Sequence, residues 1–182
     1  MYCSSCSDTM FERPVIPFLI FICCLYSYNC IIVVPERILV RDVNENYVKY
    51  ATATVRRSSK RGEYVVNVDI YTKVVIGNNV TVHINLFEYN SKYNQYVRTP
   101  MVFQYKWCEL VLHDQWFGPI LRKNGLTRCP TPVGRTTLSN LTLSGSFPFQ
   151  VPFNRGKFET IWKREATNEL LGCIETFITI LK

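Results

Sequence analysis

Apolar and polar residues alternate along much of this chain, with the period of two that is typical of half-buried β-strands. Within residues 62–73, for example, Val66, Val68 and Ile70 fall on one face and the residues between them fall on the other. Turn-forming residues separate these alternating runs. The first half of the chain therefore predicts antiparallel strands at 36–43, 47–57, 62–73, 81–89 and 96–106.

The pattern changes once before the strands resume. In 107–121, apolar residues stand at 107, 110, 111, 117, 120 and 121, a spacing that predicts one short amphipathic helix ending near Gly118 and Pro119. A loop rich in Gly, Pro and Thr follows over 122–135. Further strands are expected at 138–143, 147–151, 157–164 and 170–181. Many short strands around one helix predict an all-β fold, an antiparallel sandwich or barrel.

An apolar segment precedes the strands. Residues 15–25 have the length of a signal-peptide core, follow Arg13 and are followed by a polar patch at 27–29. We therefore divide the chain into a leader, 1–29, and one domain, 30–182. A signal anchor is the alternative, because 15–34 is long enough to span a bilayer if the polar patch is tolerated. Met10 is an alternative start to Met1, and it would leave out the cysteine pair CSSC near the N-terminus.

Four of the eight cysteines, Cys30, Cys108, Cys129 and Cys173, fall in the predicted domain. Four cysteines allow three disulfide connectivities. Cys108–Cys129 is the first choice because this pair encloses only the helix and its loop, and Cys30 and Cys173 would then join the two ends of the domain. The domain contains no C-x-x-C, which argues against a zinc site, and no other metal site is expected.

Two N-x-T sequences mark Asn79 and Asn140 as candidate glycosylation sites. Together with the leader and the even number of cysteines, they predict a secreted, extracellular glycoprotein. The net charge is +7, and the basic residues cluster only at 56–61, RRSSKR, in a predicted hairpin tip. This cluster is too short for a nucleic-acid surface, so no nucleic-acid partner is expected. A solvated turn is the simpler interpretation, with docking to anionic headgroups or an acidic partner as the alternative.

The sequence offers little catalytic chemistry. The two histidines are His83, expected to face outward from a strand, and His113, which precedes Asp114 on the predicted helix. An acid–base role for His113 and Asp114 would need a nucleophile or metal beside them, and a solvated helix face is the simpler interpretation. The chain also lacks G-x-S-x-G, H-E-x-x-H and P-loop motifs. We therefore do not expect an enzyme or a cofactor, and a secreted hydrolase is the least favoured alternative.

Aromatic residues concentrate in the second half of the domain and are the candidate ligand contacts. If some of them line an unfilled cavity, a lipid tail would gain about 0.8 kcal/mol per buried methylene. The segment 147–153, FPFQVPF, contains two prolines, which exclude a central strand and suit the lip of a cavity. The candidate lipid-binding residues are Trp116, Phe117, Phe147, Phe149, Phe153, Phe158 and Trp162.

Several motifs occur in an order that resembles one protein family. VTVHINLFEYN at 80–90 precedes FQYKWC at 103–108, an aromatic helix and RCP at 128–130. In the segment at 148–162, Pro152, Gly156 and Phe158 match a Pro-x-x-x-Gly-x-aromatic pattern, with Phe158 where the family often has Tyr. Over about 68–181 the chain resembles the insect branch of the ganglioside-activator-like proteins. These belong to the myeloid-differentiation-related lipid-recognition (ML) class, which includes chemosensory proteins.

This resemblance implies a β-cup, in which two antiparallel sheets open along one side and leave a lipid-sized cavity between them. It implies bridges corresponding to Cys30–Cys173 and Cys108–Cys129, while other bridges of the family have no cysteines here. It also implies a secreted protein that sequesters or presents a lipid or other hydrophobic small molecule, with chemosensation as its setting. A receptor or membrane surface would be a further partner, and Arg122, Lys123 or Arg155 would lie near the headgroup.

The main alternative is an adhesion or receptor-type β-sandwich, secreted or membrane-anchored, with a packed core and no ligand. Empty volume between the sheets distinguishes a carrier from such a module.

Overall fold

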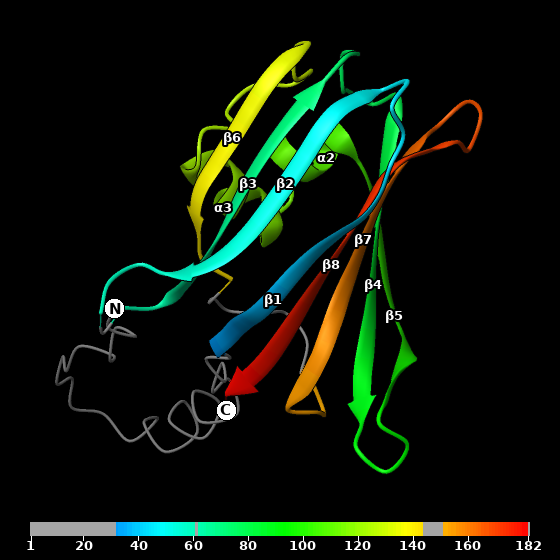
Figure 1. The fold of residues 1–182 in the computed structure, drawn as a ribbon. Helices are drawn as coiled ribbons and strands as arrows, with labels where there is room; N and C mark the ends of the chain where they lie inside the picture. The colour runs from blue at the N-terminus through cyan, green and yellow to red at the C-terminus, as the bar shows by residue number, and fades with distance from the viewer. Residues whose placement is uncertain (1–31, 61, 144–150, 182) are drawn as a thin grey trace, which may run out of the picture.

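The computed structural model describes residues 32–60, 62–143 and 151–181. These residues form eight β-strands and two short α-helices, with all strand pairings antiparallel, so the predicted antiparallel β-sandwich is confirmed (Figure 1). The predicted leader at 1–29, Cys30, and residues 147–150 of the strand predicted at 147–151, with Phe147 and Phe149, lie outside the described residues.

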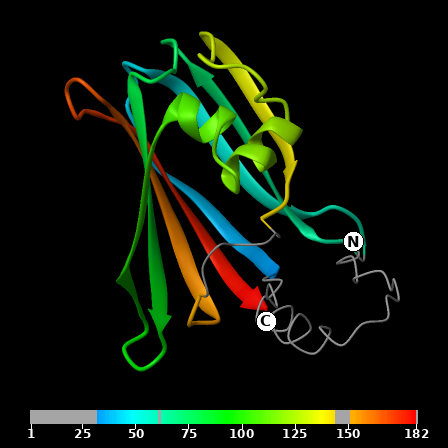
Figure 2. The ribbon, with the colours of Figure 1, turned by 180° about the vertical axis from the view of Figure 1, so that it is seen from behind.

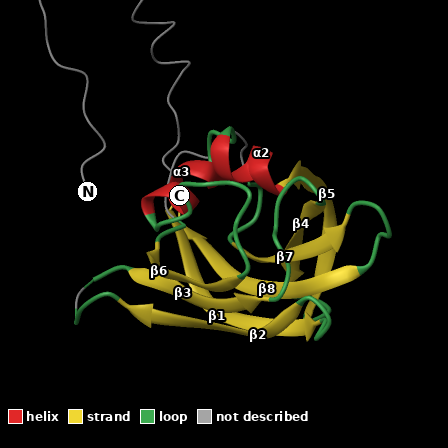
Figure 3. Ribbon diagram, turned by 90° about the horizontal axis from the view of Figure 1, so that it is seen from above, coloured by secondary structure: helices red, strands yellow, loops and turns green. Residues whose placement is uncertain are grey.

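Two sheets make up the sandwich. The larger has the order β1-β8-β7-β4-β5 and the smaller the order β2-β3-β6. The larger sheet contains β1 (Ile32–Val43), β4 (Val80–Asn90), β5 (Gln95–Lys106), β7 (Arg155–Arg164) and β8 (Leu170–Leu181). The smaller sheet contains β2 (Val48–Arg57), β3 (Tyr64–Thr72) and β6 (Gly134–Leu141). Figure 3 shows β1 and β2 on the side of the molecule opposite to the helices.

The strands follow the predicted alternation, and the main differences are at their ends. β1 begins at Ile32 and runs through Pro35, although the sequence predicts a start at 36. Pro35 is tolerated because β1 is an edge strand and its register with β8 shifts directly after this residue. β6 begins at Gly134 rather than 138, and pairs with β3 along most of its length.

The predicted single helix is two helices, α2 (Trp107–Leu112) and α3 (Phe117–Lys123). The cause is Asp114, whose Oδ1 accepts hydrogen bonds from the backbone N–H groups of Trp116 at 3.0 Å and Gly118 at 3.2 Å. Such a carboxylate satisfies the free N–H groups at the start of a helix. Gly118 and Pro119 therefore lie in the first turn of α3 instead of ending the helix, a position where proline costs no backbone hydrogen bond.

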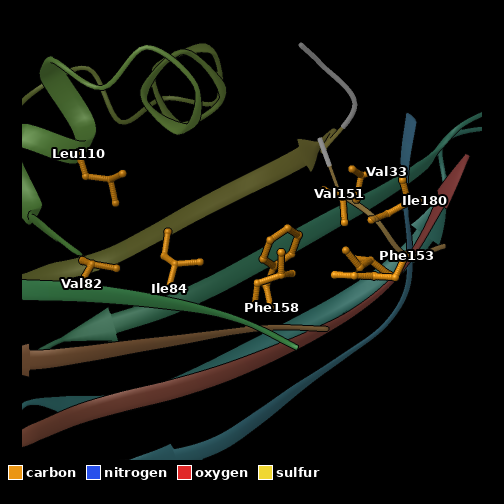
Figure 4. Close-up of a cluster of buried hydrophobic side chains, with 10 residues drawn as sticks. Val33, Val82, Ile84, Leu110, Val151, Phe153, Phe158 and Ile180 are labelled. Carbon is orange, nitrogen blue, oxygen red and sulfur yellow. The ribbon is translucent and has the colours of Figure 1, made fainter. Parts of the chain in front are cut away.

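A buried apolar cluster joins the larger sheet to α2 and to the segment before β7. Leu110 of α2 lies over Val82, whereas Val151, Phe153 and Ile180 pack at the other end of the cluster (Figure 4). Gly156 makes this packing feasible, because a Cβ there would lie 2.6 Å from the Phe153 ring and 2.4 Å from the carbonyl oxygen of Phe87. The segment before β7 is thus anchored on the larger sheet.

The face of the larger sheet that is turned away from the smaller sheet holds a buried ion pair. Glu175 of β8 is only 6% exposed, between Arg41 of β1 and Lys157 of β7. Its Oε2 accepts from Arg41 Nε at 2.6 Å and its Oε1 accepts from Lys157 Nζ. Burial by itself would raise the pKa of Glu175, but these hydrogen bonds and charges outweigh it and lower the pKa. The carboxylate therefore links three neighbouring strands.

We expect Glu175→Gln to lower the free energy of unfolding near neutral pH by about 1–3 kcal/mol, because it leaves Lys157 without its charged partner. A carboxyl whose pKa is lowered by folding stabilises the protein above its unfolded pKa, and this contribution is lost as pH falls through the folded pKa. Urea unfolding between about pH 7 and pH 3 should therefore show a smaller acid-induced loss in the variant than in the wild type.

The matched control is Asp69→Asn, which removes an exposed ion pair with Arg135 and should have a smaller effect. Equal unfolding curves for the wild type and Glu175→Gln across this pH range would contradict the role assigned to Glu175.

Candidate functional site

A cavity of about 270 Å³ lies between the two sheets. An apolar cavity of about 150 Å³ can take up benzene, so this space suits a larger hydrocarbon. Its walls are built mainly from aliphatic and aromatic side chains of both sheets and both helices. The larger sheet contributes Ile38, Val40, Val82, Ile84, Phe158, Trp162 and Ile174; the smaller contributes Ala51, Val66, Val68, Ile70, Leu138 and Leu141; the helices contribute Trp107, Leu110, Phe117, Ile120 and Leu121.

Strand alternation places these side chains on the inner faces. Ile84 of β4 pairs with Thr160 of β7, Thr160 pairs with Ile174 of β8, and Ile174 pairs with Val40 of β1. Directly paired residues share a face, so this row crosses four strands on the cavity side. In the smaller sheet, Ile70 occupies the middle of a similar row that runs from β2 to β6.

The helices hold the sheets apart along one side. α2 and α3 lie between the smaller sheet and the β4–β5 side of the larger sheet (Figure 2). Trp107, Phe117 and Leu121 of these helices face the cavity and also pack on the buried clusters of the core. At the other edge, β1 and β2 approach each other closely. The two sheets therefore approach each other at the β1–β2 edge, and the helices lie between them on the opposite side.

Three of the predicted ligand residues, Phe117, Phe158 and Trp162, line the cavity. Two others, Phe153 and Trp116, do not line it. Phe153 is buried in the core cluster against Gly156, and Trp116 is 38% exposed in the turn before α3 because the Asp114 cap separates it from the helix face. The remaining two, Phe147 and Phe149, lie outside the described residues.

Emphasis on aromatic residues missed most of the cavity wall, which is aliphatic. Ile38, Val40, Val68 and Ile70 line the cavity and are half-buried although they face inward. The period-two alternation of the strands could have identified these residues, because it places them on the inner face. On β8 the contrast is clear, because inward-facing Ile174 is half-buried whereas outward-facing Glu175 is buried.

The predicted Cys108–Cys129 disulfide is present, with the two Cα atoms 5.4 Å apart. It ties the start of α2 to the loop after α3, and so anchors the helical side of the cavity. The predicted Cys30–Cys173 bridge was wrong, because Cys173 is a free, buried thiol. Its strand register explains why: the start of β1, Ile32, pairs with Leu181, eight residues of strand from Cys173, or about 26 Å. A disulfide needs Cα atoms within about 7 Å.

Burial raises the pKa of the Cys173 thiol to about 11, and the charges of Glu159 and Asp42 act in the same direction. The thiol is therefore protonated near neutral pH and is a poor nucleophile.

His113 and Asp114 do not form an acid–base pair. Asp114 is buried and its carboxylate caps α3, whereas His113 is exposed at the end of α2. Asp114 also accepts a hydrogen bond from Tyr105, and burial together with this carboxylate raises the pKa of Tyr105 to about 12. The outward position predicted for His83 is confirmed, because its neighbours Val82 and Ile84 line the cavity.

Polar surface features fall outside the cavity. Both glycosylation acceptors, Asn79 and Asn140, are exposed, and glycosylation there stays a prediction. Among the predicted headgroup contacts, Arg122 donates to the carbonyl oxygen of Val111 at 2.6 Å and Arg155 pairs with Glu36 at 3.1 Å. Within the described part of the chain no group of His, Cys, Asp and Glu side chains is arranged to hold a metal ion. The helices described there are too short to cross a membrane.

We expect Asp114→Ala to lower the free energy of unfolding by about 1–2 kcal/mol, because it leaves the first N–H groups of α3 without their acceptor. The neighbouring variant His113→Ala is the control and should change stability by less than about 0.5 kcal/mol, since His113 is exposed. Thermal unfolding of the two variants measures the difference, and a similar loss in both would show that the cap is not what holds α3.

Comparison with known proteins does not assign the chain to a family. No protein-family model matches it, and no curated protein is significantly similar to it. The resemblance to the lipid-recognition class therefore rests on the sequence motifs at 68–181 alone.

Proposed function

We propose that this chain is a secreted protein that binds a lipid tail or another apolar small molecule between its sheets, and carries or presents it. The observation that supports this proposal is the cavity of about 270 Å³, whose walls are apolar side chains from both sheets. Well-packed protein interiors leave few voids larger than a water molecule. An apolar space of this size is therefore better explained by a bound ligand than by the packing of the fold.

The energetics favour a ligand with a hydrocarbon chain. Each methylene moved from water into such a cavity contributes about 0.8 kcal/mol, or about fourfold in affinity. Affinity should therefore rise with chain length until the cavity is filled. No charged contact is required for this gain, which is consistent with a wall made almost wholly of aliphatic and aromatic groups.

The cavity favours binding over the alternative of an adhesion or receptor module. A sandwich that recognises partners with its outer surface gains stability by packing its interior, and empty volume costs it stability. Secretion is supported by the Cys108–Cys129 disulfide and by the exposed positions of Asn79 and Asn140. Chemosensation, as the setting of this binding, rests on the family resemblance alone.

The direct test is to express the full chain through the secretory route, extract the purified protein with organic solvent and analyse the extract by mass spectrometry. We expect a lipid or other apolar compound in stoichiometric amount. A protein that yields no bound compound and also takes up no added apolar fluorophore would contradict the proposal.

A cavity-filling variant gives the structural test. We expect Ala51→Phe to weaken binding of the uncharged fluorophore N-phenylnaphthylamine at least about tenfold, because the added ring occupies ligand space. Thr54→Phe is the matched control: it adds the same ring to the same strand, but on the exposed outer face, and should leave binding unchanged. Fluorescence titration measures both affinities, and thermal unfolding verifies that each variant folds. Equal affinities in two folded variants would show that the fluorophore binds elsewhere.

A further inference from the structure

Five threonines bring hydroxyl groups to the wall of the cavity: Thr72, Thr131, Thr136, Thr160 and Thr176. Two of them have partners within the protein. Thr72 Oγ1 donates to the carbonyl oxygen of Gly134 at 3.5 Å, and Thr131 Oγ1 accepts from the indole Nε1 of Trp107 at 2.9 Å. These two hydroxyls already make hydrogen bonds that help to hold the fold.

Thr136, Thr160 and Thr176 differ from that pair, because the described part of the chain offers their hydroxyls no hydrogen-bond partner. Thr136 stands alone on β6 of the smaller sheet, whereas Thr160 and Thr176 lie together on the larger sheet. Thr176 is only 9% exposed. Among the described residues, every side-chain oxygen that is completely enclosed has a hydrogen-bond partner. The hydroxyls of Thr160 and Thr176 have none, so both must reach open space. Since both residues line the cavity, that space is the cavity itself.

The two threonines are neighbours on adjacent strands. Thr160 of β7 pairs with Ile174 of β8, and Thr176 is two residues further along β8, so the threonines are diagonal neighbours on the same face. Such neighbours lie about 7–8 Å apart between Cα atoms, within reach of one polar group of a ligand. Valine has nearly the same shape as threonine and would avoid the cost of placing a hydroxyl in apolar surroundings. The two hydroxyls therefore suit a role in recognition.

The charges around the cavity limit the kind of polar group it can take. Among its described lining residues, Asp42 is the one Asp, Glu, Lys or Arg, and it is exposed at the end of β1. A carboxylate inside this cavity would lose its hydration without gaining a cationic partner, and Asp42 would repel it. Alcohols, esters and ketones avoid this cost, and their oxygens accept hydrogen bonds from hydroxyl groups.

We propose that Thr160 and Thr176 form a neutral polar subsite, and that the ligand is an uncharged lipid with a hydroxyl, ester or ketone oxygen rather than a fatty-acid anion. This inference rests on the proposed function and names the chemical class of ligand. The apolar wall provides affinity, and the two hydroxyls set the position of the oxygen along the cavity.

The test compares compounds of equal chain length on the full chain. Decanol, decyl acetate, decanoate and decylamine compete with N-phenylnaphthylamine for the purified protein, and fluorescence measures the displacement. We expect decanol and decyl acetate to bind at least about tenfold more tightly than decanoate near neutral pH. Equal binding of decanoate, or tightest binding of decylamine through Asp42, would overturn the neutral subsite.

Isosteric variants assign the effect to the two residues. Thr160→Val and Thr176→Val should each weaken decanol binding roughly three- to tenfold, the range expected for one hydrogen bond. Binding of the fluorophore, which reports on the apolar wall, should stay the same or strengthen. Thr54→Val, on the exposed face of β2, is the control and should change neither affinity.

The two proposals fail in different ways. If the fluorophore binds but the valine variants retain full affinity for decanol, the subsite is wrong and the cavity proposal stands. If neither the fluorophore nor any of the alkyl compounds binds the folded wild type, both proposals are wrong.

Discussion

The separation of the two sheets is the constraint on which the rest of the structure depends. A sandwich with inner faces this apolar would bury more surface by closing. Here α2 and α3 occupy the side where the sheets diverge, and the Cys108–Cys129 disulfide joins the start of α2 to the loop after α3. Asp114 fixes the bend between the two helices. The helical segment thus keeps the two sheets apart, and the cavity occupies the space that remains between them.

The larger sheet is stabilised partly from its outer face, which compensates for the space on its inner face. Glu175 is buried there between Arg41 and Lys157. Phe177, the next outward-facing residue of β8, is covered by the guanidinium of Arg37 at 4.2 Å from the ring centroid and by an edge-on contact with Tyr96. Ionic and aromatic contacts on the outside therefore hold strands whose inner side chains remain free to contact a ligand.

Sequence alone predicted the strands well, because each has one buried face and the period of two is local information; β8 was predicted with the bounds that the structure shows. Features that depend on tertiary contacts were harder to predict. The break at Asp114 looked like continuous helix, because apolar spacing does not reveal a side chain that caps the next helix. The Cys30–Cys173 pairing followed from the cysteine count once Cys108 and Cys129 were paired, and from the family resemblance, and strand register decides against it. The threonine subsite could not be seen before it was known which hydroxyls the fold leaves without partners.

The short connection between β1 and β2 has a mechanical consequence. These strands belong to different sheets, and only residues 44–47 join them, with the backbone N–H groups of Tyr47 and Val48 both donating to the carbonyl oxygen of Asn44. So short a connection prevents the sheets from sliding past each other. They can separate further only by rotating about this edge, so bulkier guests would be accommodated by outward tilting of the helical side, while every strand keeps its register.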